Sequence, residues 1–204
     1  IEQGRPPGFA VTPGQVNNVN GPQIRRVIRG TFTVPCFLTE GCEPGGVMER
    51  NASGLPVRNG SYQARFTCII PQVNLPSEGG EQLWPLVHGH GLLGDADGVQ
   101  GGFTRQFAQE RGMLGCATDE IGMAEEDIPV VLNSLNNLSG FHRVPDRLQQ
   151  GLLNELFLAR LMVHPDGLSS NPAFQDGDGT TPGQPVMRSD EVFYEGVSQG
   201  GIMG

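Results

Sequence analysis

A glycine-flanked serine is the most chemically informative feature of the sequence. Residues 196–200 read Gly-Val-Ser-Gln-Gly, the spacing G-x-S-x-G, and they follow the apolar stretch 192–194, which is typical of a strand. A serine on a sharp strand-to-helix turn needs neighbours without side chains, and Gly196 and Gly200 meet that need. The pattern therefore predicts that the hydroxyl of Ser198 is a nucleophile.

A second motif lies about a hundred residues upstream. Residues 82–87 read Gln-Leu-Trp-Pro-Leu-Val, and residues 88–95 continue as His-Gly-His-Gly-Leu-Leu-Gly-Asp. An apolar strand that ends in His-Gly is the usual form of a loop that contributes a backbone amide to an oxyanion hole. In a chain with 31 glycines among 204 residues, a lone G-x-S-x-G is a weak signal. Two motifs in this order favour acyl-transfer chemistry over a glycine-rich turn.

Composition excludes several classes of function. All 13 basic residues are arginine, so chemistry that needs a lysine, such as Schiff-base formation or a serine–lysine dyad, is excluded for this chain. The net charge of -9 would repel phosphate backbones, and we expect no nucleic-acid partner. No apolar run approaches the roughly 18 residues of a membrane span. We also expect neither a metal nor a cofactor.

The four cysteines leave two interpretations open. Cys36 and Cys42 lie six residues apart around a turn-like segment, whereas Cys68 and Cys116 lie inside apolar runs. A disulfide between Cys36 and Cys42 would fit a secreted or periplasmic protein. Four buried thiols are the alternative.

The order of the expected elements predicts the class of fold. Residues 1–22, rich in Pro, Gly and Asn, are expected to form an extended N-terminal arm, and residues 23–204 to belong to one domain. Strands are expected at 24–38, 62–70, 83–87, 113–118 and from 192, and helices at 103–110, 128–138 and 144–163. This alternation predicts an α/β fold: an antiparallel start, then a mostly parallel sheet flanked by helices.

The two motifs together resemble the α/β-hydrolase fold. Residues 87–95 and 194–204 are most similar to bacterial esterase- or lipase-like members with a Gly-His-Gly-Leu-Leu-Gly loop and a Ser-Gln-Gly-Gly elbow, and the resemblance covers roughly residues 80–204. It implies a serine hydrolase that cleaves a small-molecule carboxylic ester through an acyl-enzyme on Ser198. The implied oxyanion amides are those of Gln199 and Leu92, with Gly91 as the loop glycine. Because the loop can be read in two frames, His90 is the alternative to Leu92.

The histidines do not fit a complete triad. In the family the acid and the histidine follow the serine, but all four histidines, at 88, 90, 142 and 164, precede Ser198. The resemblance therefore predicts that the fold and the triad are completed beyond Gly204, and that residues 1–204 alone are inactive. His88 and His90 are expected to shape the oxyanion loop rather than to act as bases or metal ligands.

Other polar clusters have plainer interpretations. The Asp-Gly segments 95–98 and 176–179 resemble the start of a calcium loop but lack its glutamate at the twelfth position, so solvated turns are expected. Asp119 and Glu120, just after an expected strand, either line the rim of the active site or serve a turn.

Two other functions stay open. The elbow does not specify the acyl acceptor, so a peptidase or an acyltransferase on the same fold is one alternative. A non-catalytic binding module on this fold is the other, because the triad is incomplete.

Overall fold

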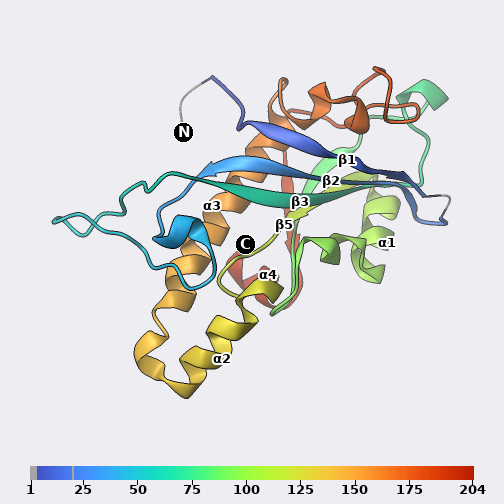
Figure 1. Cartoon of the computed structure of the whole chain (residues 1–204). Coiled ribbons are helices and arrows are strands. Elements are labelled where there is room, and N and C mark those ends of the chain that lie inside the picture. The colour runs from blue at the N-terminus through green and yellow to red at the C-terminus, as the bar shows by residue number, and fades with distance from the viewer. Residues whose placement is uncertain (1–3, 20) are drawn as a thin grey trace.

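A six-stranded mixed sheet forms the centre of the computed structural model, which describes residues 4–19 and 21–204 (Figure 1). The strands are β1 (Phe9–Asn18), β2 (Ile24–Pro35), β3 (Ser61–Pro71), β4 (Trp84–Gly89), β5 (Met113–Thr118) and β6 (Phe193–Gly196). Their order across the sheet is β1-β2-β3-β5-β4-β6. The pairs β1–β2, β2–β3 and β3–β5 are antiparallel, and β5–β4 and β4–β6 are parallel.

The predicted α/β class and the antiparallel start agree with this sheet. A mostly parallel sheet is not confirmed, because antiparallel pairing extends as far as β5. Within the predicted N-terminal arm, Phe9–Asn18 forms an edge strand that hydrogen-bonds to β2. The Pro- and Gly-rich composition of this stretch concealed the pairing, since an edge strand tolerates both residue types. Residues 1–3 lie outside the described residues, as does residue 20.

Helices α1 (Gly102–Arg111), α2 (Ile128–Asn136) and α3 (Arg143–Val163) lie close to their predicted ranges, and α4 (Gln199–Met203) follows the elbow. Gly112 ends α1 in the left-handed conformation, with φ 62°, which a residue without a side chain adopts at little cost. Helix α3 ends before Pro165, which cannot continue a helix. No helix in the described part of the chain is long and apolar enough to cross a bilayer.

Both faces of the sheet are covered. Because side chains alternate along a strand, neighbouring residues of β2 and β3 contribute to different faces. On one face α3 and the segment before β6 bury Phe32, Phe66, Leu158, Leu161 and Phe174. On the other face α1 and the turn Ala96–Gln100 bury Val27, Ile69, Leu86, Val99 and Ala108. This arrangement fixes the carboxyl ends of β4, β5 and β6 beside one another, where the two sequence motifs begin.

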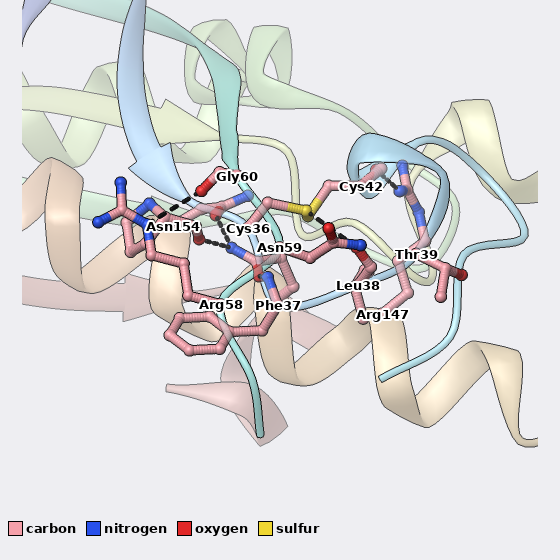
Figure 2. Close-up of a disulfide and its surroundings, with 12 residues drawn as sticks. Cys36, Phe37, Leu38, Thr39, Cys42, Arg58, Asn59, Gly60, Arg147 and Asn154 are labelled. Carbon is pink, nitrogen blue, oxygen red and sulfur yellow. Dashed lines mark hydrogen bonds between the residues drawn. A yellow bond between two sulfur atoms is a disulfide. The ribbon is translucent and has the colours of Figure 1, made fainter. Parts of the chain in front are cut away.

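A disulfide stabilises the long connection between β2 and β3, residues 36–60. Cys36 and Cys42 are joined, with their Cα atoms 5.9 Å apart, and the bond lies beside α3 (Figure 2). The carbonyl of Cys42 accepts a hydrogen bond from the buried guanidinium of Arg147, and the carbonyl of Leu38 accepts one from Asn59 Nδ2 at 3.2 Å. The connection between β2 and β3 is therefore held by bonds within it and by a hydrogen bond to Arg147 of α3.

A second disulfide joins Cys68 and Cys116, which the sequence did not predict. The two residues are direct partners in the antiparallel register of β3 and β5, with Cα atoms 4.0 Å apart. The sequence placed both cysteines in apolar runs but gave no register between those runs. All four cysteines are thus paired, in place of the free thiols that were the alternative.

Candidate active site

Ser198 occupies a strained position at the end of β6. It lies between β6 and α4 with φ 56° and ψ −111°, a conformation that a residue with a side chain rarely adopts. Such backbone strain costs about 1–3 kcal/mol and persists only where the surroundings impose it. The residue is exposed, so the strained turn presents its hydroxyl to solvent. The G-x-S-x-G pattern predicts such a tight strand-to-helix turn, and the nucleophilic role of Ser198 stays a prediction.

Two glycines of the pattern allow a close approach of three chain segments. A Cβ atom on Gly196 would lie 2.3 Å from the carbonyl carbon of Gly200, and a Cβ on Gly200 would lie 2.3 Å from the carbonyl carbon of Gly89. Neither position has room for a side chain, because the obstructing atoms are backbone. Two hydrogen bonds close the junction: Val197 N–H donates to Gly89 O at 3.1 Å, and Gly200 N–H donates to His90 O at 3.0 Å.

The His-Gly loop lies directly beside the serine. A Cβ built on Gly91 would be 4.0 Å from Ser198 Cβ and 3.8 Å from Val197 O, which is ordinary contact distance. Gly91 therefore permits a side chain sterically, unlike Gly196 and Gly200. The loop also borders a pocket of about 380 Å³ whose apolar lining includes Leu92, Phe103 and Val197. The pocket could accept an apolar group next to the elbow.

The side chain of His90 orients the peptide that carries the Leu92 amide. The ring is buried, its Nδ1 lies 2.8 Å from Gly91 O, and its Nε2 accepts a hydrogen bond from Glu120 N–H at 2.9 Å. Since Nε2 accepts, Nδ1 carries the proton and donates to Gly91 O. Gly91 O and Leu92 N–H belong to one trans peptide and point in opposite directions. Fixing the carbonyl thus fixes the direction of the N–H.

Gln199 follows Ser198 and has a buried side chain. Its Nε2 donates to Glu120 Oε2 at 2.9 Å, while its Oε1 is buried without a hydrogen-bond partner among the described residues. In that same part of the chain, neither Gln199 N–H nor Leu92 N–H donates a hydrogen bond. Both predicted oxyanion amides are thus left available. The roles of Gln199, Leu92 and the alternative His90 remain predictions.

None of the four histidines is hydrogen-bonded to Ser198 within the described residues. His88 is buried, and its Nδ1 atom is 2.5 Å from Glu195 Oε1. His142 Nδ1 faces Ser139 O, and His164 Nδ1 accepts from Asp166 N–H. His88 is thus hydrogen-bonded at the end of β4 and His90 within the His-Gly loop, and their part in an oxyanion hole stays a prediction.

A buried acidic cluster lies next to the elbow, and the sequence indicated only one member of it, Glu120, as a residue at the rim of the site or in a turn. Glu120, at the end of β5, and Glu155, on α3, are both buried. Burial, together with the negative charge of Glu120, raises the pKa of Glu155 to about 8. Tyr194 lies on the same side and donates to Gly200 O at 2.6 Å, with Glu120 Oε1 at 3.5 Å. Burial and the neighbouring carboxylates raise the pKa of Tyr194.

The remaining acidic candidates serve structural roles. Asp119 pairs with Arg65 and accepts from Ala96 N–H at 2.8 Å, and Asp95 caps the turn Ala96–Gln100. Asp178 accepts from Thr180 N–H at 2.8 Å, within the second Asp-Gly segment. Segment 95–98 leads into a 3-10 turn and segment 176–179 is a series of bends, but the expected solvation is not found throughout, because Asp176 is buried. The described residues contain no group of three or more His, Cys, Asp or Glu side chains that could hold a metal ion.

Comparison with solved structures finds two esterases that are similar to this chain to different degrees. A candidate acetyl xylan esterase from Bacteroides fragilis superposes with a TM-score of 0.50 at 12% identity, over 96% of this chain and 43% of that one. The rice cell wall degrading esterase LipA from Xanthomonas oryzae gives a TM-score of 0.31 at 16% identity, over 87% of this chain and 36% of that one.

No protein-family model matches the sequence, and neither does any curated protein. The chain spans less than half the length of the two esterases. At such low identity the likeness concerns the fold alone, and the sheet and helices form a mixed α/β fold of the esterase-like type.

Proposed function

We propose that the protein is a serine hydrolase that cleaves carboxylic esters through an acyl-enzyme on Ser198. The observation that carries the proposal is the exposed, positive-φ serine, held by two backbone hydrogen bonds against the end of β4. Such strain is typical of functional sites, because folding alone gains nothing from it. The esterase-like fold supports the same conclusion.

In this proposal each element has a chemical role. The hydroxyl of Ser198 attacks the ester carbonyl, and its proton passes to a histidine as the tetrahedral intermediate forms. The N–H groups of Gln199 and Leu92 stabilise the oxyanion. The pocket beside Leu92 and Phe103 receives an apolar part of a small ester. The intermediate then expels the alcohol, and water hydrolyses the acyl-enzyme.

We propose that the histidine and acid of the triad lie outside residues 1–204. Strand β6 forms one edge of the sheet, and Phe193 and Tyr194 on it are exposed. They line an apolar hollow of about 390 Å³ together with Leu156 of α3 and Met203 of α4. An uncovered apolar edge strand favours pairing with another strand. Further chain that covers this edge would also lie close enough to Ser198 to supply the missing base.

Two disulfides favour a secreted or periplasmic location. Disulfides persist in oxidising compartments and are rare where thiols are kept reduced. Both the Cys36–Cys42 pair and the Cys68–Cys116 pair are formed in the structure. Finding both pairs as free thiols in protein isolated from its natural compartment would argue against this location.

Ester hydrolysis by the complete protein tests the proposal. We expect hydrolysis of p-nitrophenyl esters, with Ser198→Ala reducing kcat by about 10⁴-fold or more, since the variant lacks the nucleophile. Ser139→Ala, which alters an exposed serine, is the matched control and should retain activity. Matched amide substrates, and alcohols added as acyl acceptors, distinguish an esterase from a peptidase or an acyltransferase. No hydrolysis or acyl transfer by a folded wild type would favour the binding-module alternative.

A further inference from the structure

Glu120 lies between the two segments that carry the predicted oxyanion amides. It lies two residues beyond the end of β5, and β5 pairs with β4, whose end leads into the His-Gly loop. Its carboxyl group lies against the backbone of Gly89, where an added Cβ would come within 2.6 Å of Glu120 Oε1. The side chain thus occupies a space that exists because residue 89 has no side chain.

The backbone of Glu120 fixes the loop. Glu120 N–H donates to His90 Nε2 at 2.9 Å, and this bond leaves the ring proton on Nδ1, which donates to Gly91 O at 2.8 Å. The peptide that follows Gly91 carries the Leu92 amide, so its orientation depends on the Glu120 backbone through one imidazole ring.

The carboxylate of Glu120 fixes the elbow. Its Oε2 accepts from Gln199 Nε2 at 2.9 Å, and both side chains are buried. Because Gln199 Oε1 has no partner among the described residues, this bond is the polar anchor of the Gln199 side chain there. The backbone N–H of Gln199 is the second predicted oxyanion donor.

The surroundings of Glu120 indicate a role other than stability. No salt bridge to Glu120 is present in the described part of the chain, although the residue is 2% exposed. A buried carboxylate without a cation is costly unless hydrogen bonds compensate. Gln199 supplies such a bond, and burial together with the charge of Glu120 raises the pKa of the neighbouring Glu155, which disfavours a second negative charge beside Glu120.

We propose that Glu120 is a positioning residue that sets the separation of the two oxyanion amides. Its backbone holds the Leu92 peptide through His90, and its carboxylate holds the Gln199 peptide through the side-chain amide. Glu120, just beyond β5, is therefore bonded to both segments that carry the predicted oxyanion amides, through His90 on one side and Gln199 on the other. This inference rests on the proposed esterase function.

Kinetics of Glu120 variants in the complete protein test the inference. Glu120→Ala should lower kcat about 10- to 100-fold with KM little changed, because a displaced donor weakens transition-state binding more than substrate binding. Glu120→Gln, whose side-chain carbonyl still accepts from Gln199, should restore most of kcat. Gln199→Leu should lower kcat similarly, and adding Glu120→Ala to it should lower kcat little further.

The matched control is Asp176→Ala. Asp176 is also a buried carboxylate that accepts from neutral donors, Ser77 N–H at 3.1 Å and Gln184 N–H at 2.8 Å, in the segment before β6. Its loss should lower Tm but leave kcat within about twofold of the wild type. An equal loss of kcat in Asp176→Ala and Glu120→Ala would assign the effect to stability and overturn the inference. Additive losses in the Glu120–Gln199 pair would overturn it too.

Crystal structures of the wild type and of Glu120→Ala separate this inference from the proposed function. A shift of the Gln199 N–H by about 0.5 Å or more would support positioning, since catalytic groups need placement within that range. An unmoved Gln199 N–H would overturn positioning even in an active enzyme. A folded wild type without Ser198-dependent activity would instead overturn the proposed function, while the structures would still decide whether Glu120 positions the Gln199 peptide.

Discussion

At the scale of single residues, the elbow depends on glycines whose neighbours are backbone atoms. A side chain at Gly200 would meet Gly89, and one at Gly196 would meet Gly200. Flexible side chains can move away from an intruding atom, but packed backbone can do so only if the strands move. The tightness of the turn is therefore a property of three segments together, the end of β4, the end of β6 and the start of α4.

Replacing Gly200 by valine should damage both folding and activity. The added atoms would press against the Gly89 carbonyl, and we expect a loss of at least about 3 kcal/mol in the free energy of unfolding. Denaturant unfolding measures the change. Gly102→Ala is the control, because a Cβ there has no neighbour within 4 Å. Wild-type stability in Gly200→Val would contradict the close approach described for the elbow.

The buried carboxyl of Glu155 should make stability depend on pH. Its pKa is about 8 in the folded protein against 4.5 ordinarily, so between these values the folded state retains a proton that the unfolded state releases. Its contribution to stability is thus complete below about pH 4.5 and is lost as the pH rises to about 8, with a slope of up to about 1.4 kcal/mol per pH unit.

Glu155→Gln keeps a neutral side chain at every pH, so this part of the pH dependence should disappear. Free energies of unfolding of both proteins between pH 5 and about 8 provide the measurement. The difference between the curves should change steadily in favour of the variant as the pH rises. Parallel curves would mean that Glu155 ionises normally in the folded protein.

At the scale of elements, local patterns located most helices and strands, but not their pairing. Met113–Thr118 and the end of α1 at Gly112 could be predicted because apolar runs and a terminating glycine are local signals. The pairing of β1 with β2, and the antiparallel contact of β3 with β5, depend on residues far apart in the sequence. The same distance hid the contact between Glu120 and Gln199, although Glu120 was already noted beside a strand end.

The two disulfides should differ in their contribution to stability. Cys36 and Cys42 are six residues apart, and Cys68 and Cys116 are 48 apart. From the loop-closure entropy of the unfolded chain, removing the short pair should cost about 2 kcal/mol and the long pair about 4 kcal/mol. Double alanine variants of each pair, compared by denaturant unfolding, test the order, after a non-reduced digest confirms both linkages. The reverse order would show that native packing outweighs chain entropy.

At the scale of the whole molecule, the mixed sheet brings two distant motifs together at one edge. The carboxyl ends of the parallel strands β4 and β6 carry the His-Gly loop and Ser198, and β5 between β3 and β4 carries Glu120. The order of the two motifs in the sequence led to the prediction that they act together. They lie side by side because β4 and β6 pair in parallel, with Gly89 opposite Gly196.

Covalent labelling of the complete protein with a fluorophosphonate probe tests the central claim most directly. Such a probe reacts with a serine whose hydroxyl is activated by a base and whose oxyanion is stabilised, so it reports the assembled site rather than the fold. We predict that mass spectrometry will locate the label on Ser198 in the wild type, and that Ser198→Ala will remain unlabelled. A folded wild type that stays unlabelled, or a label on another serine, would contradict the account.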